Sequence, residues 1–470
     1  MCNRAAILAA LLFLLFPPGA GSEDFPKAQG YQGIWFELGQ KGDYGDKYSG
    51  GLGTYTAKHR PIAIHAPEAR KTFFVYGGER NHDRHLLIMA GYYDHETGQV
   101  PRPTIVYDKQ GVNDPHDNAA LCIDAKGHVW VFVSGRSRKR PGFKFKSRKP
   151  YDISSFEQIS EEEMTYPQPW YIPGKGFIHC FTQYTNGREL YWNTSPDGVT
   201  WTPPRKLAGM GGHYQFSAPY QDKKVGTAFN MHPGGSVDKR TNLYYVETHD
   251  FGVTWQTVDG KSLTPPLTDP HGPGLVRDFE SEGMMVYIKD LQFDAEGNPI
   301  VLLLTSHHHM PGPQGNPRTW RTAHWRGGTW AYHDITTSTH NYDVGQLWID
   351  GAGTWRLLAP TEAGPQRWGA GGEIALWESG DQGEHWERVR MVTQNSALNH
   401  GYVRRPVNAH PDFYAFWADG NADSYSESHL YFTNEGGTQV WQLPYVMKED
   451  FEAPAPLTPQ PGLPIAAADR

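Results

Sequence analysis

The stretch "SPDGVTW" at residues 195–201 decides the fold, because it recurs as "THDFGVTW" at 248–255 and "SGDQGEHW" at 379–386. Asp accepts hydrogen bonds from nearby backbone N–H groups and Gly supplies positive φ, so each copy predicts a tight turn. The closing Trp is expected to pack under that turn. The runs before the copies, "LYW", "LYYVE" and "ALWE", are aromatic and β-branched, which favours strands. Each copy therefore predicts strand, turn and strand, a unit typical of repeat architectures.

A second pattern repeats along the chain: an alternating or apolar run, a turn, and then a strongly apolar, aromatic run. Such pairs predict antiparallel hairpins. The seven turns begin at Pro67, Asp124, Pro173, Gln221, Asp294, Asp350 and Ala409. Their spacing of roughly fifty to seventy residues is close to the four-strand blade length of known propellers, and somewhat longer. We therefore expect an all-β fold, a seven-bladed β-propeller. The alternative is a six-bladed ring in which one hairpin is an insertion.

The three copies of the first motif resemble the Asp boxes (BNR repeats) of sialidase-like β-propellers. The resemblance implies that Asp197, Asp250 and Asp381 are structural staples rather than catalytic groups. The boxes are expected at the later hairpins of three blades. The segment "GYQGIWFEL" at residues 30–38 has no partner hairpin, and we expect it to complete the last blade and close the ring.

The two ends of the chain differ in composition from the rest. Residues 1–22 hold a charged start, an apolar run and small residues, which predicts a secretory signal peptide and a secreted or periplasmic protein. No later segment is apolar enough to cross a membrane. Residues 23–450 are expected to form a single β-propeller catalytic domain. Residues 451–470 are Pro-rich and are expected to form an extended C-terminal tail.

Charge and cysteine content exclude several classes of function. The net charge of −8 is not segregated into a basic face, which argues against a nucleic-acid partner. The basic run "SGRSRKRPGFKFKSRK" at residues 134–149 is either a solvated loop or a rim that attracts an acidic substrate. Cys122 and Cys180 lie in strand-like runs. Buried thiols are expected there, with pairing as the alternative, and no zinc spacing is present.

Candidate site residues precede the predicted inner strands, because the first residues of those strands line the central funnel of a propeller. The set comprises His59, His116, Tyr166, Gln168, His213, Tyr214, Gln215, Arg277, Glu280, Glu282, His340, Tyr342, His400, Tyr402, Arg404 and Arg405. Imidazole exchanges protons near neutral pH, tyrosine can serve as an acid, and arginine pairs with carboxylates. The composition of the funnel therefore predicts a site for an acidic sugar. The run "TSHHHMPG" with His307–His309 is a weaker candidate for a metal site, because adjacent strand residues point to opposite faces.

Several segments are similar to one family: "GYQGIWFEL", "DKYSGGLGTYTAKHRPIAIHAPEARKTFFVYGG", "DPHDNAALCIDAKGHVWVFVSGRSRKRPG", "GGHYQFS" and "HPGGSVDKRTNLYYVETHDFGVTW". They resemble the BNR-repeat propellers of glycoside hydrolase family 145, α-L-rhamnosidases that remove rhamnose capping glucuronate in arabinogalactan. The same superfamily includes seven-bladed lyases that cut rhamnose–uronate linkages, among them ulvan lyases. The resemblance implies a rhamnose–glucuronate substrate and, from the "TAKH" context, a catalytic His59.

These observations support three hypotheses. The first is a His-dependent glycoside hydrolase that releases terminal α-L-rhamnose, with His59 as the acid. The second is a lyase, in which His116 or Tyr214 abstracts a proton and Arg240 neutralises the uronate. The third is a carbohydrate-binding propeller without catalysis.

The expected partner is an acidic polysaccharide or oligosaccharide that contains rhamnose and uronic acid. No nucleic acid is expected, and no membrane after signal cleavage. No cofactor is required, and a structural divalent cation stays an open alternative. The predicted substrate-binding residues are His213, Gln215, His232, Arg240, His400 and Arg404.

Overall fold

The computed structural model describes residues 24–80 and 83–457. The predicted signal peptide lies outside the described residues, as do residues 458–470 of the predicted tail. Within the described ranges, no helix is long and apolar enough to span a membrane.

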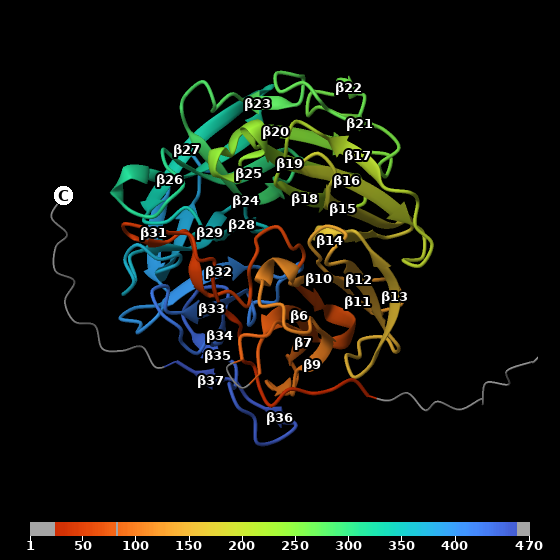
Figure 1. Ribbon diagram of the computed structural model, residues 1–470, viewed down its shortest axis with the longest axis vertical. Coiled ribbons are helices and arrows are strands. Elements are labelled where there is room, and N and C mark those ends of the chain that lie inside the picture. The colour runs from red at the N-terminus through yellow and green to blue at the C-terminus, as the bar shows by residue number, and fades with distance from the viewer. Residues whose placement is uncertain (1–23, 81–82, 458–470) are drawn as a thin grey trace, which may run out of the picture.

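Seven antiparallel sheets stand around a central axis, and their first strands gather at the centre of the ring (Figure 1). The first blade contains β5 (Ala63–Ala66), β6 (Lys71–Gly78), β7 (Leu87–Asp94) and β9 (Thr104–Asp108). The second contains β10 (Ala119–Ile123), β11 (Val129–Val133), β12 (Gly142–Ser147) and β13 (Phe156–Glu162). The third contains β14 (Thr165–Ile172), β15 (Gly176–Tyr184), β16 (Arg188–Ser195) and β17 (Arg205–Ala208).

The remaining four blades follow the same order with small additions. The fourth contains β18 (Gln215–Tyr220), β19 (Lys224–Met231), β20 (Thr241–Thr248), β21 (Trp255–Gln256), β22 (Ser262–Leu263) and β23 (Leu275–Arg277). The fifth contains β24 (Met285–Phe293), β25 (Pro299–Ser306), β26 (Arg318–Arg326) and β27 (Thr329–Ser338). The sixth contains β28 (Gln346–Ile349), β29 (Trp355–Glu362), β30 (Glu373–Ser379) and β31 (Glu387–Met391). The seventh contains β32 (Asn399–Arg404), β33 (Ala415–Gly420), β34 (Leu430–Thr433), β35 (Val440–Gln442) and β37 (Ala455–Pro456).

Short elements occupy the connections between these strands. The short strands are β1 (Trp35–Glu37), β2 (Lys41–Gly42), β3 (Gly45–Asp46), β4 (Ser49–Gly51), β8 (Val100–Pro101) and β36 (Phe451–Glu452). The 3₁₀ turns are η1 (Pro67–Ala69), η2 (Pro115–Asp117), η3 (Pro233–Gly235), η4 (Val237–Lys239) and η5 (Pro313–Gly315).

The seven-bladed all-β prediction is confirmed, and each predicted hairpin forms the first two strands of a blade. The first strand of the seventh blade begins earlier than the sequence pattern indicated. It covers Asn399–Arg404 and ends shortly before Pro406, because proline has no N–H to donate to the neighbouring strand.

Each Asp box forms the turn between the third and fourth strands of its blade. In the first box, Asp197 Oδ1 accepts hydrogen bonds from the amides of Val199 at 2.9 Å and Thr200 at 2.7 Å. Gly198 has φ +77°, a conformation that disfavours other residues, and its carbonyl accepts the Trp201 indole N–H at 2.7 Å. The Asp197 carboxylate therefore acts as a structural staple of this turn, as the sequence predicted.

The N-terminal end of the described chain joins the first and last blades by backbone hydrogen bonds. The amides of Tyr31 and Gly33 donate to Pro444 and Ser428 of the last blade, whereas the Ile34 amide donates to Gly77 of the first. β1 itself pairs with β4, so residues 30–38 bridge two blades. The expectation that this segment completes the last blade is wrong.

The start of the predicted tail also belongs to the propeller. β36 pairs with β8 beside the first blade, and β37 pairs with β35 of the seventh. The expected boundary at residue 450 therefore lies too early, since β37 extends the sheet of the seventh blade and β36 forms a two-stranded sheet with β8.

Candidate functional site

A narrow hollow of about 30 Å³ lies where the first strands of the blades begin. Most of its lining is aromatic or cationic: Tyr55, Lys58, Tyr214, Phe216, Arg240, Tyr287, Lys289, Tyr342 and Tyr402. No carboxylate is among the described residues that line it. Lys58, Arg240 and Lys289 are basic, although burial lowers the pKa of Lys289 to about 7, so the hollow favours a negatively charged group of a ligand.

Three of the lining or flanking residues sit at irregularities of first strands. Residues of β14, β24 and β32 lose register with their neighbours at Tyr166, Lys289 and Tyr402. Tyr166 and Tyr402 have φ of +53° and +56°, which bulky residues rarely adopt. A bulge re-aims a side chain, and here three separate bulges direct side chains toward the axis.

The Tyr214 phenol lies among cations and is buried. The Lys58 ammonium is 4.1 Å from the centre of the Tyr214 ring, and the Arg240 guanidinium is 4.8 Å from it. Burial opposes ionisation of this phenol, yet the guanidinium groups of Arg188 and Arg240 and the Tyr166 hydroxyl lower its pKa below the ordinary value. Tyr214 is therefore a phenol prepared to lose its proton.

Arg240 is held rigidly at the side of the hollow. Its Nε donates to the Val237 carbonyl at 2.9 Å, and its Nη2 donates to the Tyr342 hydroxyl at 2.9 Å. The guanidinium also lies 4.5 Å from the centre of the Tyr287 ring. A guanidinium fixed in this way presents its remaining N–H groups in a set direction.

Lys58 is the least satisfied cation of the site. Within the described part of the chain, its ammonium contacts the rings of Tyr214 and Tyr166 and forms no hydrogen bond or ion pair. Burial, followed by the charge of Arg240, lowers the pKa of Lys58 well below its ordinary value. An anionic ligand at this point would restore both the charge balance and the hydrogen bonds of the ammonium.

His116 anchors a hydrogen-bonded network next to the hollow. Its Nδ1 lies against the Asp114 carboxylate, which also accepts from Arg136 at 3.1 Å and from Arg140 at 2.8 Å. Its Nε2 contacts the Tyr55 hydroxyl at 2.8 Å. Burial lowers the pKa of His116 to about 4 although Asp114 opposes this shift, so the ring is neutral near pH 7. With the Nδ1 proton on the Asp114 side, Nε2 accepts the Tyr55 proton.

The basic run at 134–149 is therefore neither a simple solvated loop nor a free rim. Arg136 and Arg140 turn back to Asp114 beside His116, and Arg140 also binds Asp117 at 2.8 Å. The Lys144 ammonium is buried over the Trp201 ring at 3.6 Å. Arg136 and Arg140 therefore support His116 through Asp114, whereas Lys144 pairs with Glu162 away from the hollow.

Of the predicted site residues, the structure brings His116, Tyr214 and Arg240 together at the hollow. His59 is fully buried behind it, and its Nε2 reaches no described partner. His232 is also fully buried, with its ring 4.6 Å from Tyr214, and neither of its nitrogens has a described partner. These two imidazoles adjoin the site without lining it.

Two other predicted residues, His213 and Gln215, form hydrogen bonds with the backbone. His213 uses both nitrogens, one toward the Met210 amide at 3.0 Å and one toward the Asn230 carbonyl at 2.8 Å. Gln215 donates to the Phe181 carbonyl at 3.1 Å. Both side chains join neighbouring segments and are absent from the lining of the hollow.

Arg404 does not line the hollow but holds the segment that does. It is fully buried and donates to the carbonyls of Thr54 at 3.0 Å and Thr56 at 2.6 Å, and also to that of His59. Since residues 54–59 carry Tyr55 and Lys58, Arg404 positions two lining residues.

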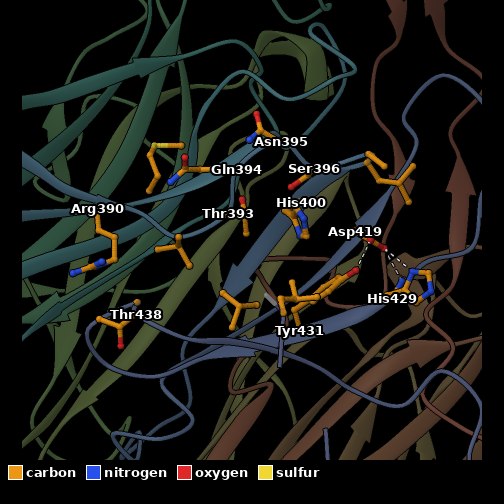
Figure 2. A pocket seen from close by; sticks show the side chains of 17 residues that line it. Arg390, Thr393, Gln394, Asn395, Ser396, His400, Asp419, His429, Tyr431 and Thr438 are labelled. Atoms are coloured by element: carbon orange, nitrogen blue, oxygen red, sulfur yellow. Dashed lines mark hydrogen bonds and ion pairs between the residues drawn. The ribbon is translucent and has the colours of Figure 1, made fainter. Parts of the chain in front are cut away.

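His400 lies in a different cavity, between the sixth and seventh blades, with a volume of about 570 Å³ (Figure 2). Its Nδ1 accepts the Trp417 indole N–H at 2.9 Å. Figure 2 also shows Asp419 joined to Tyr431 and His429 on the same wall. The expectation that His400 faces the central funnel is wrong, because the bulge in β32 after Gly401 breaks the alternation that would have aligned it with Tyr402.

Sequence reasoning missed Lys58, Tyr55, Asp114 and Arg188. Lys58 and Tyr55 were present in the distinctive run "YSGGLGTYTAKH", and Asp114 opens "DPHDN", so attention to whole runs would have found them. Cys122 and Cys180 are buried free thiols, as expected. His307–His309 do not form a cluster of three metal-ligating groups within the described ranges.

Comparison with known proteins adds a family and several relatives. Residues 79–338, more than half of the chain, match the family described as "BNR repeat-containing family member". An ulvan lyase from Nonlabens ulvanivorans is 23% identical over 372 residues, which cover 68% of this chain and 75% of that protein.

Solved structures of polysaccharide lyases share the fold. One of family PL25 has a TM-score of 0.69 at 18% identity, covering 83% of this chain and 95% of that one. The same enzyme family bound to -[GlcA(1-4)Rha3S]- has a TM-score of 0.70 at 17% identity, covering 87% and 96%. Polysaccharide lyase Uly1 has a TM-score of 0.61 at 12% identity, covering 88% and 99%. These matches do not show the expected resemblance to glycoside hydrolase family 145. The chain belongs to the BNR repeat-containing family.

Proposed function

We propose that the protein is a polysaccharide lyase that cleaves a rhamnose–uronate polysaccharide by β-elimination. The observation that carries the proposal is the Tyr214 phenol, whose pKa is lowered, beside the Lys58 and Arg240 cations. The similarity to ulvan lyases, one of them bound to -[GlcA(1-4)Rha3S]-, supports the substrate class.

The size and charge of the hollow suit the carboxylate of a uronate rather than its ring. A cavity needs roughly 10–15 Å³ open to the centre of a water-sized sphere to hold one water molecule, so the hollow, with about 30 Å³ of such space, holds a small polar group. In the proposed complex the uronate carboxylate accepts hydrogen bonds from Arg240 and Lys58, and the sugar ring lies above. Neutralising the carboxylate makes the adjacent C5–H more acidic and so lowers the barrier to removal of the C5 proton.

Tyr214 acts in its deprotonated form: the phenolate, stabilised by the guanidinium groups of Arg188 and Arg240, takes the C5 proton and becomes a neutral phenol. Electrons of the C5–H bond form the C4–C5 double bond, and the bond between C4 and the bridging oxygen breaks. The leaving oxygen receives a proton, for which Tyr55 is placed at the hollow and hydrogen-bonded to His116. His116 and Asp114 are positioning residues in this scheme, because they act through Tyr55. Water is not consumed.

A rhamnosidase receives less support. Most glycosidases use two carboxylates, and none lines the hollow in the described part of the chain. His59 is enclosed behind the pocket wall, where its imidazole does not reach a ligand in the hollow. We further propose that the protein is secreted or periplasmic, where a large polysaccharide is accessible.

The test is incubation of the protein with ulvan while ultraviolet absorbance of the new double bond is recorded. We expect absorbance to rise for the natural chain and for the control Tyr171→Phe. Tyr171 lies near the last residue of β14, whereas the first residues of that strand are the ones near the hollow. Tyr214→Phe should lose roughly a hundredfold or more in rate. Release of sugar without absorbance, or full activity of Tyr214→Phe, would overturn the proposal.

A further inference from the structure

A group of metal-ligating side chains lies at the opposite end of the blades from Tyr214. His95 follows the third strand of the first blade, and His410 and Asp412 lie in the connection between β32 and β33 of the seventh. In an antiparallel blade, the end of the third strand and the turn after the first strand share one face. The site is thus at the seam where the ring closes. There the His65 amide donates to the Val407 carbonyl at 2.9 Å.

The three side chains converge closely. One ligating atom of each of His95, His410 and Asp412 lies within 4.8 Å of the others, and this is the one such group found in the described residues. The two imidazole rings are 3.9 Å apart between centres. Ligands on a tetrahedral zinc ion with bonds of about 2.0–2.1 Å lie somewhat closer together, so small side-chain rotations would complete the geometry.

The hydrogen bonds around the group leave nitrogen lone pairs available. His95 Nε2 is 2.8 Å from the Thr72 hydroxyl, whereas its Nδ1 is buried and has no described partner. His410 Nδ1 accepts from the Asp412 amide at 3.2 Å, which leaves Nε2 of that ring for a ligand. A hydroxyl that fixes one nitrogen and orients the other toward a metal is the usual support of a ligating histidine.

The types of ligand also indicate a class of metal. The Asp412 side chain is exposed and supplies the negative charge. Two imidazoles and one carboxylate suit zinc and similar transition metals, while calcium and magnesium prefer oxygen ligands.

We propose that His95, His410 and Asp412 bind a divalent transition metal of the zinc class that clamps the first blade to the seventh. The site is separate from the central hollow and does not depend on the proposed lyase activity. Without metal, the two imidazole rings lie 3.9 Å apart between centres, and His410 Nδ1 is 3.7 Å from the Asp412 carboxylate.

The experiment is calorimetric titration of Zn²⁺ into the full chain after chelator treatment, with thermal unfolding measured in parallel. We expect about one saturable zinc per chain and a higher Tm with metal. His410→Ala and Asp412→Asn should each weaken zinc binding by more than roughly tenfold, which is the smallest usual loss when a residue that only hydrogen-bonds to a metal ligand is removed. The control His333→Ala, on a distant outer strand, should bind as the natural chain does.

Two outcomes would overturn the proposal. One is the absence of saturable zinc binding by the natural chain, which would leave a stacked histidine pair with a structural role. The other is binding that is unchanged in both His410→Ala and Asp412→Asn. Because Asp412 is exposed, its amide variant is expected to fold and keeps the test decisive if His410→Ala does not.

Discussion

At the scale of single residues, the central hollow concentrates positive charge that the protein does not itself neutralise. Lys58 and Arg240 line it with no carboxylate among the described lining residues. Burying unpaired cations costs folding free energy, so their presence is more readily explained by an anionic ligand than by stability. Burial opposes ionisation of Tyr214, but the guanidinium groups of Arg188 and Arg240 lower its pKa below the ordinary value.

Arg240→Lys should damage turnover more than folding. Lysine retains the charge but cannot donate at once to Val237, Tyr342 and a carboxylate. We expect kcat/KM on ulvan to fall roughly a hundredfold with little change in Tm. Arg277→Lys is the matched control, because Arg277 forms an ion pair with Glu282 away from the hollow. Equal losses in both variants would contradict the role assigned to Arg240.

At the scale of elements, the segment at residues 54–59 depends on a buried arginine from the last blade. Arg404 donates to carbonyls of that segment, and the Thr54 hydroxyl donates to the Tyr402 carbonyl at 2.8 Å. The site is therefore assembled across the seam of the ring.

Arg404→Met should remove the donors while keeping most of the volume. Loss of the donors leaves carbonyls without partners, and this cost exceeds the gain from no longer burying the Arg404 charge. We expect the free energy of unfolding to fall by about 2 kcal/mol. Activity should fall as well, since Lys58 and Tyr55 lose their support. Chemical denaturation and absorbance assays measure the two effects. The exposed Arg326→Met, which loses one surface ion pair with Glu384, should change neither quantity appreciably.

The repeat pattern made the elements predictable, because every hairpin combines local turn chemistry with an apolar strand. The Asp boxes and the seven inner hairpins needed no long-range information. The bulges at Tyr166, Lys289 and Tyr402 were not predictable in this way, since a bulge depends on the neighbouring strand. This is why His400 was placed in the wrong cavity while Tyr402 was placed correctly.

At the scale of the whole molecule, the position of a residue before an inner strand was a sound guide to the face but not to the role. It found His116 and Tyr214 at the hollow. It also selected Arg404 and His213, whose polar groups the backbone consumes. Burial and hydrogen-bond partners distinguish residues that are available at the hollow from residues that are bonded to the backbone. Both depend on the packing of adjacent blades.

Several buried neutral histidines should make the fold sensitive to acid. Burial lowers the pKa of His116 and His213 to about 4 and that of His340 to about 3. Unfolded histidine takes up a proton near pH 6.5, so the unfolded state binds more protons below that pH and stability falls as pH drops from about 6.5 toward 4. We expect Tm to decline over this window. A Tm that is constant from pH 7 to about 4 would contradict the buried neutral state.

The central claim is elimination, and product analysis in water enriched in heavy oxygen tests it most directly. A lyase breaks the bond between C4 and the bridging oxygen without water, so mass spectrometry of ulvan fragments should show an unsaturated uronate, without heavy oxygen, at each new non-reducing end. Fragments that each gain one heavy oxygen and carry no double bond would identify a hydrolase and contradict the account.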